Sequence, residues 1–274
     1  MKELTLGYSP CPNDTFIFYA LVHNRVPLKN ISFAPPVLED VETLNLWALE
    51  KKLAVTKLSF HALGHVLDHY VMLSAGAALG RGCGPLLVTR KGHAFDPARD
   101  RIAVPGKYTT AAMLLRLYAP GCENIRIMRF DRIMPALAQG RIEGGVIIHE
   151  SRFTYGDFDL QLVEDLGAWW EKETGLPIPL GCIAARKNLP EAMLREIENA
   201  IRSSLEWAQN NIGRCLPYVR KYAQEMSIDV LQNHIDLYVN DFSLHMGEEG
   251  KAATVELLRR GREAGIFPVP DEPE

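Results

Sequence analysis

The feature that most constrains the fold is a regular alternation of short apolar runs with helical segments. The first series of predicted strands is at residues 4–8, 31–34, 53–58 and 70–74, with predicted helices between them at 14–22, 39–51 and after Ser59. A second series begins at 102–104 and continues to 160–163. Such alternation is typical of a largely parallel sheet covered by helices. The sequence therefore predicts an α/β protein.

Two similar strands divide this pattern. Residues 86–91 and 180–187 are both small apolar runs that end in Arg-Lys. We interpret them as two crossover strands that join two α/β lobes. The larger lobe is expected to combine 1–89 with 186–274, including helices after Pro190, and the smaller lobe, 90–185, is inserted in it. The sequence thus predicts a bilobal clamshell of the type II periplasmic-binding-protein-like kind, with a ligand cleft between the lobes.

Composition narrows the class of protein. The 274 residues contain 30 basic and 34 acidic side chains, a net charge of -4 with no basic block, so nucleic acid and membrane surfaces are not expected partners. The five scattered cysteines include no C-x-x-C motif, which argues against a zinc ribbon or a disulfide framework. No signal peptide or transmembrane run is visible. We expect a cytoplasmic protein whose oligomeric state the sequence leaves open.

His149 is the first candidate for chemistry. The apolar run 146–148 predicts a short buried strand, and the run stops at this histidine. An imidazole on the rim of a strand is suited to proton transfer because its ordinary pKa lies near neutrality. The alternative is a histidine that only caps the strand and hydrogen-bonds a neighbour.

Three strand-to-helix junctions carry polar residues. They are Pro12-Asn13-Asp14, with Asn13 as the expected N-cap, Lys57-Leu58-Ser59, with Ser59 as the cap, and Tyr108-Thr109-Thr110-Ala111. Helix N-termini present free N–H groups and partial positive charge, so each junction could hold a carboxylate, with Lys57 and Lys107 close to two of them. Ordinary helix capping would explain the polar residues at any one of these junctions. Their presence in both lobes favours a small anionic ligand in the cleft.

Two further motifs give weaker indications. His61, His65 and His69 are spaced to share one helical face, but no H-E-x-x-H motif accompanies them, so no metal site is expected. The glycines of Gly80-Arg81-Gly82-Cys83-Gly84 precede a strand instead of opening a helix, which excludes a dinucleotide loop. We read a tight turn near the cleft, with Arg81 as a plausible ligand contact.

Cysteine and tryptophan complete the candidates. Cys11 lies at a helix start, which could lower the pKa of its thiol. However, no histidine is near it in the sequence, so a thiol nucleophile is not predicted. Trp169 and Trp170 are expected to pack in the core instead of stacking on a ligand.

Several long segments together resemble the 1,4-dihydroxy-6-naphthoate synthases, enzymes of the futalosine route to menaquinone. The similarity extends from residue 4 to about residue 250. The segments that carry it are Ser9-Pro10-Cys11-Pro12-Asn13-Asp14-Thr15-Phe16, Asp40-Val41-Glu42-Thr43-Leu44-Asn45, Thr56-Lys57-Leu58-Ser59, Gly80-Arg81-Gly82-Cys83-Gly84-Pro85 and Ile148-His149-Glu150-Ser151-Arg152-Phe153-Thr154-Tyr155.

The resemblance implies a carbon–carbon lyase without metal or organic cofactor. Its substrate would be cyclic dehypoxanthinyl futalosine, a carboxylate, and its products 1,4-dihydroxy-6-naphthoate and dihydroxyacetone. The catalytic base of the family corresponds to His149. The substrate-contacting segments correspond to Lys57-Leu58-Ser59 and Thr110-Ala111, with Thr109 adjacent. The alternatives are the sister dehydratase that acts on chorismate, and a non-catalytic solute-binding or effector-sensing protein of the same fold.

Overall fold

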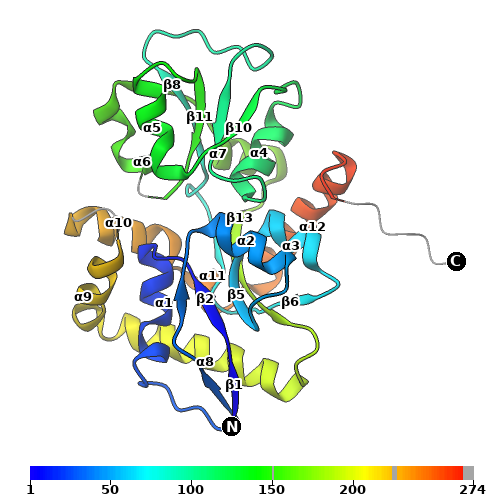
Figure 1. The fold of residues 1–274 in the computed structure, drawn as a ribbon, viewed down its shortest axis with the longest axis vertical. Coiled ribbons are helices and arrows are strands. Elements are labelled where there is room, and N and C mark those ends of the chain that lie inside the picture. The colour runs from blue at the N-terminus through cyan, green and yellow to red at the C-terminus, as the bar shows by residue number, and fades with distance from the viewer. Residues whose placement is uncertain (150, 224–226, 268–274) are drawn as a thin grey trace, which may run out of the picture.

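The strands form two main sheets that lie in separate lobes (Figure 1). The computed structural model describes residues 1–149, 151–223 and 227–267. Within these residues, the larger-lobe sheet has the order β4(Val37–Leu38)-β2(Leu6–Tyr8)-β5(Val55–Ser59)-β13(Ile178–Arg186)-β6(Tyr70–Met72), and β7(Ala78–Gly80) also pairs with β13. The smaller-lobe sheet has the order β10(Ile125–Ile127)-β9(Ile102–Val104)-β11(Gly144–Ile147)-β8(Leu86–Arg90)-β12(Leu160–Asp165). A separate pair joins β1(Lys2–Leu4) to β3(Ile31–Phe33).

Strand direction differs from the expectation of a largely parallel sheet. β2 runs parallel to β4 and β5, and β9 runs parallel to β10 and β11. By contrast, β13 is antiparallel to β5, β6 and β7, and β8 is antiparallel to β11 and β12. An apolar run carries no information on direction, so the sequence pattern could not distinguish these cases. Both sheets are therefore mixed.

The two predicted crossover strands each belong to one sheet. Residues 86–90 pair only within the smaller-lobe sheet, and residues 178–186 pair only within the larger-lobe sheet. The chain passes between the sheets just before each of them, at 81–85 and at 175–177. The two-lobe α/β architecture is confirmed, whereas the lobe boundaries at 90 and 186 stay a prediction.

Helices cover both sheets as the alternation predicted. Among the described helices none is both long and apolar enough to span a bilayer. The larger lobe carries α1(Pro12–Val22), α2(Val41–Leu49), α3(Phe60–Val66), α8(Glu191–Gln209), α9(Ile212–Tyr222), α10(Ile228–Tyr238), α11(Asp241–Leu244) and α12(Gly247–Glu263). The smaller lobe carries α4(Thr110–Tyr118), α5(Phe130–Ala138), α6(Ser151–Thr154), the 3-10 turn η1(Tyr155–Phe158) and α7(Leu166–Thr174).

Helix α1 is buried on nearly every face. It packs against α8, α9 and α10, and Phe16, Ile17 and Phe18 are each at most 2% exposed. Ser204 of α8 secures this contact, because its hydroxyl donates to the Ile17 carbonyl at 2.6 Å and accepts from the Leu21 N–H at 3.0 Å. These bonds hold the middle and the C-terminal part of α1 against α8, and the residues at its N-terminal end belong to the site described below.

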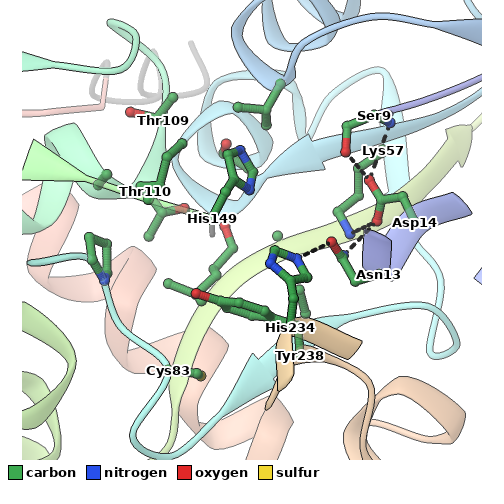
Figure 2. Close-up of a pocket in the computed structure, with 18 residues that line it drawn as sticks. Ser9, Asn13, Asp14, Lys57, Cys83, Thr109, Thr110, His149, His234 and Tyr238 are labelled. Atoms are coloured by element: carbon green, nitrogen blue, oxygen red, sulfur yellow. Dashed lines mark hydrogen bonds and ion pairs between the residues drawn. The ribbon is translucent and has the colours of Figure 1, made fainter. Parts of the chain in front are cut away.

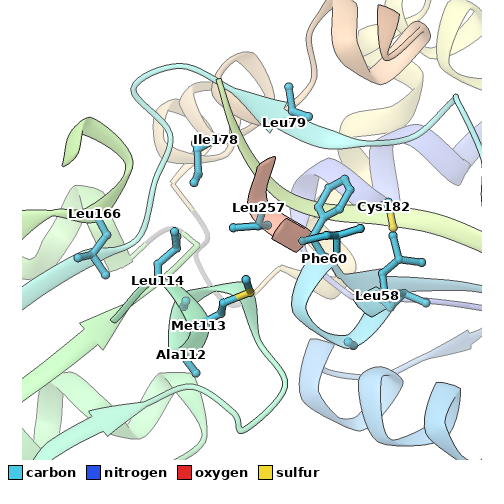
Figure 3. Packing of buried hydrophobic residues seen from close by; sticks show 14 of the residues in the cluster. Leu58, Phe60, Leu79, Ala112, Met113, Leu114, Leu166, Ile178, Cys182 and Leu257 are labelled. Carbon is cyan, nitrogen blue, oxygen red and sulfur yellow. The ribbon is translucent and has the colours of Figure 1, made fainter. Parts of the chain in front are cut away.

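One apolar cluster extends across both lobes (Figure 3). It brings Leu58 and Phe60 of the larger lobe together with Met113 and Leu114 of α4 and Leu257 of α12. α4 contacts α3 and β13 as well as its own sheet. Burial of apolar side chains stabilises by about 25 cal/mol per Å². The N-terminal end of α4 is therefore packed against the larger lobe.

A close backbone approach explains one glycine of the turn at 80–84. A Cβ atom added at Gly84 would lie 2.2 Å from the Gly167 Cα at the start of α7. Real Cβ atoms do not approach backbone so closely, so only glycine fits. This contact fixes the passage from β7 to β8 against the smaller lobe.

Candidate active site

A cavity with a volume of about 650 Å³, including its open mouth, lies between the lobes (Figure 2). Residues of both lobes contribute to its walls. The lining residues are Ser9, Asn13, Asp14, Val41, Lys57, Ser59, Ala78, Cys83, Pro85, Thr109, Thr110, Ala111, Ile148, His149, Leu180, Gly181, His234 and Tyr238.

Six of the seven residues predicted for the site line this one cavity: Lys57, Ser59, Thr109, Thr110, Ala111 and His149. The seventh, Leu58, does not line it, because its side chain is fully buried in the apolar cluster. Alternation along β5 explains the difference, since successive side chains of a strand point to opposite faces.

His149 follows β11 in a backbone conformation that is unusual for its residue type. Its φ is 58°, in the left-handed region. Residues other than glycine are uncommon there, although histidine is enriched among them, and the conformation costs on the order of 1–2 kcal/mol. Such local strain is a recurrent feature of functional sites. The turn brings the ring into the cavity, where Phe130 packs on it edge-on at 5.1 Å between ring centroids.

Cys11 of the larger lobe contacts this ring. Its Sγ atom lies 3.3 Å from Nδ1 and 3.6 Å from Nε2 of His149. The two residues are 138 positions apart in sequence, so the lack of a nearby histidine was the wrong reason to set Cys11 aside. The fold supplies the histidine from the opposite lobe. A thiol within hydrogen-bond reach can orient an imidazole ring.

Beside this pair lies a buried ion pair. The Lys57 ammonium is 2.6 Å from Asp14 Oδ1, and the two side chains are 6% and 1% exposed. Asp14 also accepts from the Ser9 hydroxyl at 2.7 Å and from the Asn13 amide at 2.9 Å. The buried carboxylate is thus matched by a cation and neutral donors, as a buried charge requires.

The expected N-cap role of Asn13 is wrong. Cys11 occupies the N-cap position of α1 and Pro12 follows it at the first helical position. Proline at that position is favourable because the N–H group it lacks would have had no helical partner. Asn13 lies one residue later, and its side chain joins Asp14 to the His234 ring. Its function is to organise the polar wall of the cavity.

The N-terminus of α4 is the predicted anion-binding junction of the smaller lobe. The sequence predicted a polar cap in this junction, and Thr109 is the N-cap, accepting from the Ala112 N–H at 3.2 Å. Three hydrogen bonds tie Thr109 and Thr110 to the larger lobe. His61 donates from Nδ1 to the Thr109 carbonyl at 3.0 Å and from its N–H to the Thr110 hydroxyl at 3.4 Å, and the Thr110 hydroxyl donates to the Leu180 carbonyl at 2.7 Å. Burial lowers the pKa of His61 to about 4, so its ring is neutral.

Lys107 and Ser59 differ in detail from expectation. Lys107 does not line the interlobe cavity; its ammonium lies over the Tyr108 ring, 5.1 Å from the centroid. Ser59 holds the N-cap position of α3 but makes no side-chain capping bond. Ser59 is instead bonded to the Asn45 amide, which accepts from the Ser59 N–H at 2.9 Å and donates to the Ser59 hydroxyl at 3.1 Å.

The turn at 80–84 contributes Cys83 to the cavity, and Pro85 follows it. Arg81, a plausible ligand contact from sequence, donates to the Gly175 carbonyl at 2.9 Å and pairs with Glu249 at 2.7 Å outside the cavity. The Arg152 guanidinium donates to the Gly84 carbonyl at 2.5 Å and braces the turn. Glu150 lies outside the described residues.

The histidine series is broken by the end of α3. This helix ends at Val66, so His69 does not share its face. The rings of His61 and His65 lie 5.3 Å apart, and His61 is buried. Among the residues that the structure describes, no group of three or more His, Cys, Asp or Glu side chains is placed to hold a metal ion. Trp170 is fully buried in the core, as predicted, with its indole N–H on the Pro177 carbonyl.

Sequence reasoning missed two residues of α10 that line the cavity. His234 and Tyr238 are one helical turn apart, and their rings lie 4.6 Å from each other. Burial, together with the nearby His149 and Lys57, holds the pKa of His234 well below its usual value. Burial also raises the pKa of the Tyr238 hydroxyl. The available signal was a histidine and a tyrosine at spacing four on the apolar side of a helix.

Known proteins match this chain over almost its whole length. A family model described as menaquinone biosynthesis matches residues 4–263. A 1,4-dihydroxy-6-naphthoate synthase from Thermus thermophilus is 52% identical over 97% of this chain and 96% of its own, and one from Streptomyces coelicolor is 43% identical over 97% and 95%. The chain belongs to the 1,4-dihydroxy-6-naphthoate synthase family. It is therefore an enzyme of menaquinone biosynthesis.

Solved structures match this chain in fold. Protein AF1704 from Archaeoglobus fulgidus superposes with a TM-score of 0.91 at 36% identity, covering 96% of this chain and 98% of its own. The periplasmic aliphatic sulphonate binding protein SsuA from Escherichia coli superposes with a TM-score of 0.65 at 13% identity, covering 98% and 89%. The second likeness concerns the fold alone and supports the periplasmic-binding-protein-like architecture of this enzyme family.

Proposed function

We propose that this enzyme is a carbon–carbon lyase that converts cyclic dehypoxanthinyl futalosine to 1,4-dihydroxy-6-naphthoate and dihydroxyacetone, with His149 as the general base. The observation that carries the proposal is the His149 ring, which lines a cavity shared by both lobes in a chain of this family. The reaction needs a proton acceptor beside a carbonyl group, and imidazole is the side chain best suited to that role near neutral pH.

The carboxylate of the substrate is proposed to bind at the N-terminus of α4. Thr110 and Ala111 begin this helix and line the cavity, and the partial positive charge of a helix N-terminus attracts anions. Lys57 lines the same cavity and adds positive charge, although Asp14 pairs with it. A carboxylate held there would fix one end of the substrate.

His149 would then remove a proton next to the carbonyl group of the substrate. The carbon–carbon bond then breaks with its electron pair passing to the leaving three-carbon fragment, which takes the proton back from His149. The hydroxyl group on the ring carbon loses its proton and becomes a carbonyl group, and the ring then tautomerises to the aromatic diol. Proton transfer and aromatisation suffice for this reaction, so we propose that no metal or organic cofactor takes part. The Cys11 thiol, 3.3 Å from Nδ1, would keep the ring oriented during both transfers.

The test is to incubate the purified enzyme with cyclic dehypoxanthinyl futalosine and to follow the naphthoate by absorbance. His149→Ala should keep its fold but lose turnover by at least ~10²-fold, the usual lower range for a positioned base. His245→Ala is the matched control, because His245 is exposed and bonds Ser74 outside the cavity.

Three outcomes separate the parts of this proposal. Full turnover by His149→Ala would show that another group is the base. Binding of the substrate by the wild-type enzyme without turnover would favour a ligand-binding role for the chain. If the wild-type enzyme neither bound nor converted this compound, the proposed substrate would be wrong.

A further inference from the structure

His234 holds a hydrogen-bonding atom that the protein itself does not use. The residue is 1% exposed, and its Nε2 lies 3.1 Å from Asn13 Oδ1. Among the described residues no group hydrogen-bonds the other ring nitrogen, Nδ1, which is buried. A buried polar atom without a partner is unfavourable, and native proteins rarely keep one without a reason. The proposed mechanism does not involve this ring.

The surrounding network fixes which nitrogen of His234 carries the proton. Asp14 can only accept, so Asn13 turns its amide nitrogen toward Asp14, at 2.9 Å from Oδ1. The Asn13 oxygen then faces His234, and a carbonyl oxygen can only accept a hydrogen bond. The Nε2 atom of His234 therefore carries the proton and Nδ1 carries a lone pair. The Lys57 ammonium, 2.6 Å from Asp14, holds this arrangement in place.

The ring also stays neutral. Burial and the two neighbouring groups His149 and Lys57 depress the pKa of His234 well below its ordinary value. A neutral ring bonded through Nε2–H can act at Nδ1 only as an acceptor. It would favour a hydroxyl or amine group of a ligand and disfavour a carboxylate or carbonyl oxygen.

Its place in the cavity brings this acceptor close to the proposed base. The rings of His234 and His149 have centroids 6.3 Å apart and planes inclined by 27°. Figure 2 shows both rings among the residues that line the cavity, with one nitrogen of His234 directed to Asn13 and the other on the side of His149. A ligand group that reached His149 would therefore lie near His234.

We propose that His234 is a substrate-binding residue whose Nδ1 lone pair accepts a hydrogen bond from a hydroxyl group of the substrate. This rests on the proposed function, in which one product, dihydroxyacetone, brings hydroxyl groups into the cavity. The acceptor would draw the hydroxyl-bearing end of the substrate toward α10 while the carboxylate binds at α4. His234 would thus set the direction in which the substrate lies across His149.

Two substitutions separate the acceptor from the bulk of the ring. His234→Leu removes both nitrogens, whereas His234→Asn can place an amide oxygen close to the position of Nδ1. Loss of a neutral hydrogen bond to substrate should lower kcat/KM by roughly tenfold in His234→Leu, mostly through KM, and His234→Asn should recover part of it. His245→Leu serves as the control outside the cavity. Thermal unfolding of each variant checks its fold.

Substrate analogues that each lack one hydroxyl give a readout that a purely structural role would not change. The wild-type enzyme should discriminate by about tenfold against one of these analogues, and His234→Leu should lose that discrimination. Equal discrimination by both enzymes would overturn the proposal. The reaction of wild-type enzyme with the parent substrate tests the proposed function by itself. If no naphthoate formed in that reaction, the proposed function would be wrong, independently of the result for His234.

A second measurement does not depend on a folded His234 variant. In His149→Ala enzyme labelled with [¹⁵N]histidine, the Nδ1 resonance of His234 should move when cyclic dehypoxanthinyl futalosine is added, because a lone pair that accepts a hydrogen bond changes its shielding. A resonance that stays in place at saturating substrate would exclude a bond to this nitrogen.

Discussion

Removal of the Lys57 ammonium should destabilise the fold well beyond the loss of an ordinary ion pair. The substitution Lys57→Met keeps most of the side-chain volume but leaves the Asp14 carboxylate buried without its cation. Asp14 would retain the Ser9 hydroxyl at 2.7 Å, the Ser9 N–H at 3.2 Å and the Asn13 amide at 2.9 Å. Three neutral donors compensate a buried charge only in part.

The size of the effect follows from the burial of both side chains, which are 6% and 1% exposed. Breaking such a pair by removing one partner typically costs about 3–5 kcal/mol. The donors that remain on Asp14 place this case near the lower value, about 3 kcal/mol. For a protein of this size that corresponds to a fall in Tm of roughly 6–12 °C.

A double-mutant cycle with Asp14→Asn tests the reasoning. Each single variant leaves a buried group without its partner, while the double variant removes both charges, so its loss should be smaller than the sum of the single losses by about 2 kcal/mol. The free energy of unfolding is measured in urea by far-UV circular dichroism. Lys251→Met, which breaks the exposed pair with Glu248, should change nothing measurable. Additive single losses would refute the coupling.

Two further predictions concern stability. The pKa of His61 is about 4 in the folded chain and about 6.5 when the residue is exposed. The unfolded chain therefore binds the extra proton between these values, and this residue should lower the free energy of unfolding by about 3 kcal/mol as the pH drops from 6.5 to 4. In urea unfolding of His61→Gln, the free energy of unfolding should fall less steeply with pH, and an equal slope would contradict this. Gly84→Ala should lower Tm strongly because its Cβ would overlap the Gly167 backbone. The control Gly213→Ala in α9 has open space around its Cβ and should leave Tm unchanged. Equal Tm values for the two variants would show that the close approach is unimportant.

The sequence predicted the elements well because their signals are local. Among the helices expected after Pro190, helical apolar spacing and the preceding Ser227 indicate one at 228–238, and the structure places α10 at the same residues. Pro12 marked the true start of α1, yet the polar Asn13 was preferred as a cap. Strand direction in β8 and β13 was not predictable, since it depends on which strands a run meets after folding.

The site was predictable only where its residues followed strands. His149, Ser59 and Thr110 come at the ends of predicted strands or at helix starts, where ligands bind in α/β sheets. The Cys11 contact joins residues 138 positions apart in sequence, and the bond that orients His234 joins it to Asn13, 221 positions away. No local pattern in the sequence encodes contacts over such separations. The buried environment that keeps His234 neutral is likewise a property of the packed lobes.

The place of β13 in the larger-lobe sheet has a consequence for biosynthesis. This strand separates β5 from β6, although it follows the whole smaller-lobe sheet in the chain. A nascent polypeptide that has left the ribosome as far as β7 therefore carries three strands, β5, β6 and β7, that lack their β13 partner and are open to mispairing. We expect the larger lobe to reach its native arrangement only after translation has passed Arg186, so that ribosome-bound chains stopped earlier should be sensitive to protease.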